Sequence, residues 1–217
     1  MLLLTKSIFA VMIGFFLSAI LGFFIVPLFK RMHVGQRISS YVGENHKKKE
    51  GTPTMGGIIF ILSTVIAMLV LVATGRVSYT SNLGIVLIVF IGHGLIGLLD
   101  DLLSIKKKNN EGLTVYQKLF LQVLIAILFF YIYMKNGGQT AFVVGTLHID
   151  IEMGFLYGLF ILLILVGSTN AVNLTDGLDG LAGGLSAIAM LDFALISLMV
   201  GYEDIGIFCL VLCGSLV

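Results

Sequence analysis

Long apolar runs are the feature of this sequence that most constrains its fold. A helix that crosses a membrane needs about 20 consecutive, mostly apolar residues. The 217-residue chain offers such runs near 7–29, 53–73, 83–99, 119–134, 155–172 and 181–200. Hydrophobic residues make up 58% of the chain and charged residues only 12%, more apolar character than a soluble core requires. The sequence therefore predicts an all-α polytopic membrane protein, a single transmembrane domain over residues 1–217 with six complete transmembrane helices.

A seventh apolar run begins near Ile205 and extends to Val217. Its thirteen residues cannot cross a hydrocarbon layer about 30 Å thick. We therefore expect the chain to end inside a seventh helix and to be an N-terminal fragment of a longer protein.

The basic residues predict the orientation of the helices. Short cytoplasmic connections carry an excess of Lys and Arg. If the first run enters from outside, the cytoplasmic loops are about 30–52, 100–118 and 173–180. They then hold ten of the thirteen basic residues: Lys30, Arg31, Arg37, Lys47, Lys48, Lys49, Lys106, Lys107, Lys108 and Lys118. Segment 139–152, with glycines before it and alternating residues within it, predicts a small extracytoplasmic β-hairpin.

A first polar cluster, Lys47-Lys-Lys-Glu-Gly-Thr-Pro-Thr-Met-Gly-Gly57, opens the second apolar run. Thr52 suits a helix N-cap and Pro53 the first helical position. The free N–H groups of such a helix start attract phosphate. An ordinary capped helix start explains Thr52 and Pro53 equally well.

A second cluster, Asp100-Asp101, is predicted to end the third apolar helix. Two adjacent carboxylates at a helix C-terminus repel each other and oppose the helix dipole. A magnesium ion would relieve this repulsion, because it binds one or two carboxylates together with phosphate oxygens and water. The alternative is a solvated helix end with Lys106–Lys108 as counterions.

A third cluster spaces Asn170, Asn173, Asp176 and Asp179 three residues apart. Such neighbours lie close together on a helix. Gly177 and the glycines that follow allow the chain to turn or a ligand to approach the backbone. Polar groups beside an apolar run point to a binding site. The alternative is a structural turn between two helices. The sequence leaves the roles of His93 and Asp192, inside apolar runs, open.

These motifs resemble the phospho-N-acetylmuramoyl-pentapeptide transferase family, within the polyprenyl-phosphate N-acetylhexosamine-1-phosphate transferase superfamily. The resemblance rests on four segments: Gly51-Thr-Pro-Thr-Met-Gly-Gly57, Gly97-Leu-Leu-Asp-Asp101, Glu111-Gly-Leu113 with Gln117-Lys118, and Asn170-Ala-Val-Asn-Leu-Thr-Asp-Gly-Leu-Asp-Gly-Leu-Ala182. It implies transfer of phospho-MurNAc-pentapeptide from UDP-MurNAc-pentapeptide to undecaprenyl phosphate, which gives lipid I and UMP and requires Mg²⁺. It also implies the bacterial plasma membrane as the location, with the active site on the cytoplasmic face.

The resemblance assigns roles to matching residues. Asp100 and Asp101 correspond to the catalytic aspartates and are candidate metal ligands. Substrate-binding positions are Lys48 or Lys49, Thr52, Lys118, Asn173, Asp176, Gly177 and Asp179. The lipid bilayer and a second copy of the chain are further expected partners, and no nucleic acid is expected.

The chain also departs from the family pattern. The family has ten helices, a metal-binding aspartate in a Met-Gly-Asp segment and a histidine-rich loop, and this sequence contains neither of those two segments. The main metal ligand is therefore expected beyond Val217, and the 217-residue chain alone is expected to be inactive. Two alternatives stay open, a related polyprenyl-phosphate GlcNAc-1-phosphate transferase and a membrane transporter.

Overall fold

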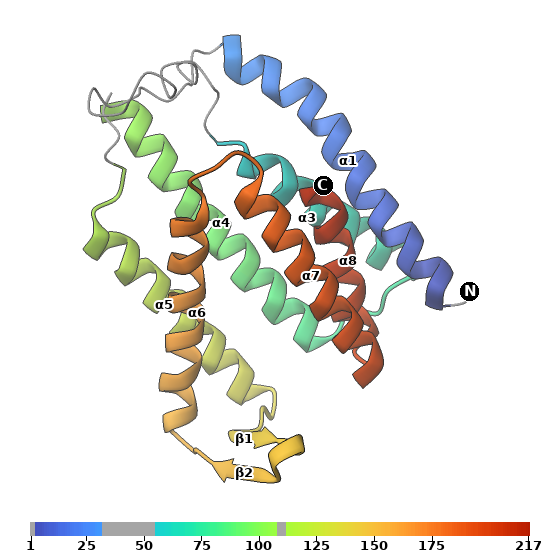
Figure 1. The fold of residues 1–217 in the computed structure, drawn as a ribbon, viewed down its shortest axis with the longest axis vertical. Coiled ribbons are helices and arrows are strands. Elements are labelled where there is room, and N and C mark those ends of the chain that lie inside the picture. The colour runs from blue at the N-terminus through green and yellow to red at the C-terminus, as the bar shows by residue number, and fades with distance from the viewer. Residues whose placement is uncertain (1–2, 32–54, 108–111) are drawn as a thin grey trace.

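The computed structural model describes residues 3–31, 55–107 and 112–217, and most of these residues form helices (Figure 1). The elements are α1 (Leu3–Arg31), α3 (Gly57–Ala73), α4 (Ser81–Lys107), α5 (Val115–Lys135), β1 (Ala141–Val144), the 3₁₀ helix η1 (Gly145–Leu147), β2 (Ile149–Glu152), α6 (Leu156–Thr175), α7 (Leu181–Val200) and α8 (Glu203–Leu216). The predicted all-α membrane architecture is confirmed.

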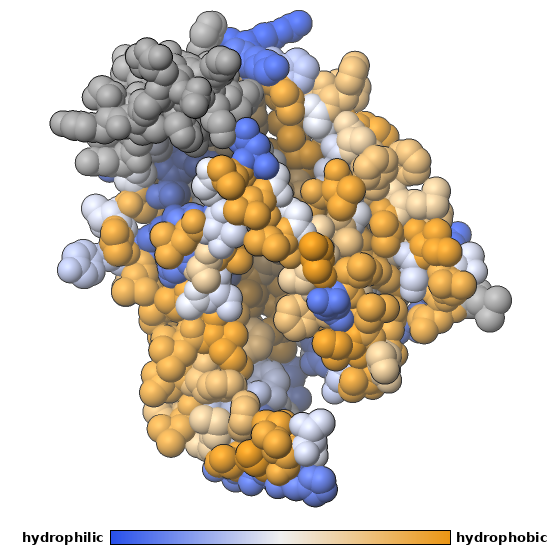
Figure 2. Space-filling model, viewed as in Figure 1, coloured by the Kyte–Doolittle hydropathy of each residue, from blue (hydrophilic) through white to orange (hydrophobic). Residues whose placement is uncertain are grey.

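Five of the described helices are long and apolar enough to cross a membrane: α1, α4, α5, α6 and α7. Apolar side chains cover much of the visible surface (Figure 2), as expected of helices that face lipid rather than water. The run predicted at 53–73 gives a shorter apolar helix of 17 residues, α3. The protein is therefore a multi-pass membrane protein.

The start of α3 differs from the sequence prediction. Thr52 and Pro53 were expected at the N-cap and the first helical position, but α3 begins at Gly57 with Gly56 as its N-cap. Met55 has a φ of 69°, which a right-handed helix excludes. The predicted helix start is therefore wrong. Thr52 and Pro53 themselves lie outside the described residues.

The predicted hairpin is confirmed. β1 and β2 pair antiparallel, with Ala141 opposite Glu152 and Val144 opposite Ile149. His148, with a φ of 53°, completes the turn that η1 begins. The hairpin lies at the opposite end of the helices from the α6–α7 connection (Figure 1).

The hydrophobic core surrounds α8, which packs mainly against α1 and α7 and also against α3 and α4. Most α8 residues are buried, as expected of a helix that is apolar on almost every side. At the crossing of α1 and α8, a Cβ atom on Gly14 would lie 2.1 Å from the carbonyl oxygen of Val211. A Cβ on Gly214 would lie 2.1 Å from the carbonyl oxygen of Val11. Two glycines therefore allow the two backbones to touch.

The helices α4, α5 and α6 pack in sequence order, with α5 against both of its neighbours, whereas α6 makes few contacts with α7. The space-filling surface is hollowed between the α5–α6 side and the remaining helices (Figure 2).

Candidate active site

The aspartate pair lies within α4 and not at its end. The sequence predicted that Asp100 and Asp101 would close the helix, but α4 continues to Lys107. That prediction is wrong, and the two carboxylates do not lie in the last turn, where the helix dipole would oppose them. The helix instead ends on Lys106 and Lys107, basic residues that suit the negative end of its dipole. The carboxylates are thus presented from the side of a continuous helix.

Asp100 is held by the connection between α4 and α5. Its Oδ2 forms a 3.1 Å salt bridge with Lys118 Nζ, and its Oδ1 accepts a 2.7 Å hydrogen bond from the backbone N–H of Leu113. A Cβ on Gly112 would lie 2.4 Å from Asp100 Oδ1, so only glycine fits here. Lys107 Nζ donates to the carbonyl oxygen of Gly112 at 2.9 Å, which ties the connection to the end of α4.

The start of α5 fixes Lys118. Thr114 caps the helix, and its side chain and that of Gln117 exchange hydrogen bonds with each other's backbone N–H groups. This capping box places Lys118 in the first turn, where its Nζ also lies 3.5 Å from Asn173 Oδ1 on α6. Lys118 and Asp100 are only 22% and 28% exposed, so their ion pair is less screened than a surface pair. One lysine thereby joins three helices.

Asp101 connects the pair to the first polar cluster. It interacts electrostatically with Asp100 and Lys118, and it accepts a hydrogen bond from the backbone of Met55, just before α3. The described part of the Met-Gly-Gly segment therefore lies beside the aspartates. Lys48, Lys49 and Thr52, predicted to bind substrate, lie outside the described residues.

The third cluster is divided between a helix and a turn. Asn173 is in the last turns of α6, and Asp176 is its C-cap. Gly177 donates its backbone N–H to the carbonyl oxygen of Thr175 at 2.8 Å. Gly180, with a φ of 78°, is the N-cap of α7, a backbone conformation that favours glycine.

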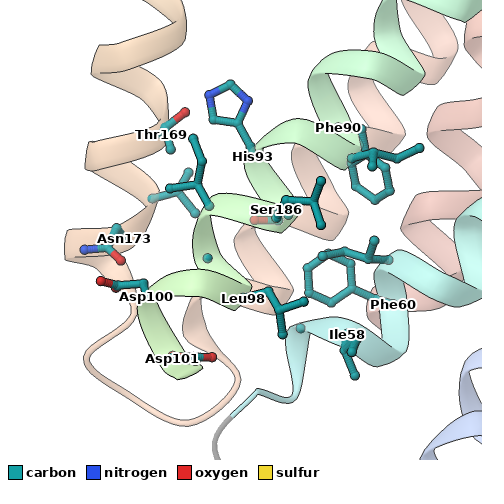
Figure 3. Close-up of a pocket in the computed structure, with 18 of the residues that line it drawn as sticks. Ile58, Phe60, Phe90, His93, Leu98, Asp100, Asp101, Thr169, Asn173 and Ser186 are labelled. Carbon is teal, nitrogen blue, oxygen red and sulfur yellow. The ribbon is translucent and has the colours of Figure 1, made fainter. Parts of the chain in front are cut away.

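A cavity of about 1030 Å³ brings most of these residues together. Its lining contains the polar residues Asp100, Asp101, Lys118, Gln122, Ser168, Thr169, Asn173, Asp176 and Ser186, together with His93 and the start of α3. Figure 3 shows Asp100, Asp101 and Asn173 at one end of this space and His93 with Thr169 at the other. Gly177 and Asp179 are outside its lining, so the structure does not bring these two predicted residues to the cavity.

Sequence reasoning missed several residues of the cavity. Gln122 is 1% exposed and lies one turn beyond Lys118 on α5. A polar residue inside an apolar run was the available signal for it. His93, whose role was open, lines the cavity, and its Nδ1 lies 3.0 Å from the carbonyl oxygen of Val89. Asp192 lies on an exposed face of α7, outside the lining.

The arrangement suits binding of phosphate groups together with a divalent cation. Two neighbouring carboxylates provide hard oxygen ligands of the kind that Mg²⁺ takes along with substrate phosphates and water. A lysine and amides provide donors for phosphate oxygens. Within the described part of the chain, no group of three or more His, Cys, Asp or Glu residues forms a metal cluster. The two carboxylates alone would leave most of the coordination shell of such a cation to water and ligand oxygens.

The fold and site define a multi-pass membrane protein with an acidic, lysine-bearing cavity at one end of its helices. Residues 83–217 match the model of Glycosyl transferase family 4, which covers more than half of the sequence. The chain therefore belongs to glycosyl transferase family 4. Residues 49–61 match Phospho-N-acetylmuramoyl-pentapeptide-transferase signature 1.

Curated relatives point to the same branch of the family. The chain is 41% identical over 206 residues to the phospho-N-acetylmuramoyl-pentapeptide-transferase of Geobacillus sp. (strain WCH70), covering 95% of this chain and 63% of the relative. It is 41% identical over 214 residues to that of Clostridium novyi (strain NT), covering 98% of the chain and 65% of the relative. It is 42% identical over 213 residues to that of Staphylococcus aureus (strain bovine RF122 / ET3-1), covering 97% of the chain and 64% of the relative. The predicted resemblance is confirmed, and the chain spans just under two thirds of the length of these relatives.

Proposed function

We propose that the protein containing this chain transfers phospho-MurNAc-pentapeptide from UDP-MurNAc-pentapeptide to undecaprenyl phosphate, with lipid I and UMP as products. One observation supports this most. Asp100, Lys118 and Asn173, from three helices, meet in a cavity at one end of an apolar bundle. A water-soluble nucleotide and a membrane lipid can meet only at such a boundary. The 49–61 signature and the names of the relatives favour this donor over UDP-GlcNAc.

The reaction requires two phosphate groups to approach each other despite their charge. Lys118 would neutralise part of that charge, and Asp176 and Asn173 would bind polar groups of the donor. Asp100 and Asp101 would hold Mg²⁺, which neutralises charge on the pyrophosphate when it is bound. The hydrogen bond from the backbone N–H of Leu113 holds the carboxylate of Asp100 in position before any substrate binds.

In the direct route, an oxygen of the lipid phosphate attacks the β-phosphorus of the donor. A new P–O–P bond forms to the lipid, the bond from the β-phosphorus to the bridging oxygen breaks, and UMP leaves with that oxygen. A phosphate monoester, with a second pKa near 6, is mostly dianionic at neutral pH, so a strong general base is not required. Asp100 or Asp101 would orient this phosphate or take its remaining proton. The competing route attaches the phosphosugar to an aspartate first, and inversion at phosphorus would exclude it.

The site is proposed to face the cytoplasm of a bacterium. The ends of α1 and α4 carry Lys30, Arg31, Lys106 and Lys107, and Lys118 is in the first turn of α5. In the alternating order of the helices these ends share one side, and basic residues favour the cytoplasm. A second copy of the chain is a further proposed partner, which the mass of the detergent-solubilised protein would test.

The test is formation of lipid I by the purified whole protein that contains this chain, from labelled UDP-MurNAc-pentapeptide and undecaprenyl phosphate. We expect a Mg²⁺-dependent product and stoichiometric UMP. UDP-GlcNAc in place of the donor is the matched control, and we expect no transfer from it. Transfer from UDP-GlcNAc alone would replace this proposal with the GlcNAc-1-phosphate reaction. Transport of a solute without any transfer product would replace it with the transporter alternative.

A further inference from the structure

The side-chain amide of Gln122 is buried, and only its oxygen has a hydrogen-bond partner among the described residues. Its Oε1 accepts a 2.8 Å hydrogen bond from Asn170 Nδ2 on α6, which fixes the orientation of the amide. Its Nε2 is buried and has no hydrogen-bond partner among the residues that the structure describes. A buried donor without a partner is costly, so native proteins rarely keep one without a ligand or water to fill it. Because Gln122 lines the cavity, that partner is expected there.

Gln122 and Lys118 form a pair along α5. They are four residues apart, which places them on one face of the helix, with Gln122 about 6 Å further from the start of the helix. Lys118 supplies a positive charge, and Gln122 supplies two N–H groups that no acceptor in the described part of the chain engages. This combination suits the oxygens of a phosphate group.

His93 is the other cavity residue with an unpartnered buried nitrogen. Its Nδ1 lies 3.0 Å from the carbonyl oxygen of Val89, which leaves Nε2 for a ligand. Nε2 is buried and without a partner among the described residues. An imidazole nitrogen donates a hydrogen bond only when it carries a hydrogen, whereas the amide of Gln122 always carries two N–H groups. We therefore place the phosphate at Gln122.

The apolar part of the cavity indicates which substrate carries this phosphate. Besides Gln122, the lining includes the apolar residues Ile61, Val65, Val89, Phe90 and Leu165. Such a surface suits an isoprenoid chain and offers little to a ribose or a base. On the basis of the proposed function, we propose that Gln122 and Lys118 form the subsite for the phosphate of the acceptor lipid, with Gln122 Nε2 donating to a phosphate oxygen.

The informative variant is Gln122→Glu, which keeps the oxygen that accepts from Asn170 but replaces both N–H donors with a negatively charged oxygen. We expect the KM for undecaprenyl phosphate to rise at least about tenfold. The KM for UDP-MurNAc-pentapeptide should stay within about twofold. Gln122→Met, which removes the donors without adding charge, should shift the lipid KM in the same direction by less. If Gln122→Glu does not fold, Gln122→Met provides the test of the lipid KM in its place.

Asn170→Ala is the control for a purely structural role, because it breaks the link between α5 and α6 but keeps both N–H donors of Gln122, which stay free to turn toward a phosphate. We expect it to keep the lipid KM within about threefold, whatever its turnover rate. An equal rise in both KM values for Gln122→Glu, or a lipid effect of Asn170→Ala as large as that of Gln122→Glu, would overturn the subsite. An unchanged lipid KM would overturn it as well, and would assign the donors of Gln122 to a buried water.

A binding measurement separates this inference from the proposed function. The thermal unfolding midpoint of the detergent-solubilised protein is measured with undecaprenyl phosphate and with undecaprenol, the same lipid without its phosphate. We expect stabilisation by the phosphate beyond that by the alcohol, lost in Gln122→Glu and kept in Asn170→Ala. If no lipid I forms but this pattern appears, the subsite stands and the reaction fails. If lipid I forms and the pattern is absent, the reaction stands and the subsite fails.

Discussion

Lys118 on α5 forms a 3.1 Å salt bridge with Asp100 on α4, although the two residues are separated by a helix end, a connection and a new helix start. The same Nζ reaches Asn173 on α6. This single ammonium group joins three helices at the point where the aspartates face the cavity. Replacing Lys118 therefore tests both the contacts between these helices and the proposed role of its positive charge.

Lys118→Met should abolish most of the activity. It removes the charge proposed to neutralise the two reacting phosphates as they approach each other, and we expect a loss of about 10²–10³-fold in kcat. Lys118→Arg keeps the positive charge but replaces the compact ammonium group with a larger, planar guanidinium group. We expect a partial loss of activity, because the guanidinium does not fit the position that Nζ occupies between Asp100 and Asn173. The measurement is the steady-state rate of lipid I formation. A Lys118→Met variant with near-native kcat would exclude a role for this lysine in the transition state.

Gly112→Ala should displace Asp100 without unfolding the protein. The added methyl group would lie 2.4 Å from Asp100 Oδ1, so the carboxylate or the connection has to shift. We expect at least about a tenfold loss of activity, because small misplacements at a reacting centre are costly. Gly145→Ala, between β1 and β2, is the matched control, since its added methyl group would meet no atom within 4 Å. Equal activity of the two variants would contradict the packing of Gly112 against Asp100.

The aspartate pair should determine the response to magnesium. We expect EDTA to remove activity and added Mg²⁺ to restore it. Asp101→Asn removes one hard anionic ligand and should raise the Mg²⁺ concentration for half-maximal activity by about tenfold or more. The stabilisation of the protein by Mg²⁺ with UMP, measured as a shift in the unfolding midpoint, should fall in parallel.

Asp192→Asn is the control for charge alone, because Asp192 is exposed on α7 and outside the cavity. It should respond to Mg²⁺ as the native protein does. A magnesium response that is unchanged in Asp101→Asn, or lost equally in Asp192→Asn, would rule out the aspartate pair as the metal site.

Gly14→Ala and Gly214→Ala should destabilise the fold. Each added methyl group would lie 2.1 Å from a backbone carbonyl oxygen of the facing helix, so α1 and α8 would have to separate. We expect each substitution to cost about 1–3 kcal/mol in the free energy of unfolding. Gly22→Ala on α1 meets no atom within 4 Å and should be neutral or slightly stabilising, because alanine favours helix. Thermal unfolding in detergent measures all three, and a Gly14→Ala midpoint at the native value would contradict the close crossing.

The sequence predicted the parts of this fold that depend on local composition. The apolar runs near 119–134 and 181–200 became α5 and α7 with similar bounds, because a run of about 20 apolar residues has one stable arrangement in lipid. The hairpin near 139–152 followed from its alternating residues and glycines. The motif around Asp100, Lys118 and Asn173 was also visible, since polar residues beside apolar runs stand out.

The tertiary structure decided where helices begin and end and which side chains share a cavity. The helix α4 continues past the aspartates, and α3 begins only after Met55, because neighbouring segments bind the polar groups there. Gln122 and Asp179 both stand out in the sequence as polar residues within or beside apolar runs, and only the packing shows that Gln122 lines the cavity and Asp179 does not. The physical reason is that an apolar run becomes a helix because lipid offers its backbone no other hydrogen-bond partners. A site, in contrast, forms from side chains that meet only after the helices have packed. The sequence thus determined the membrane helices and the chemistry they carry, and the packing of α4, α5 and α6 determined which of those groups act together.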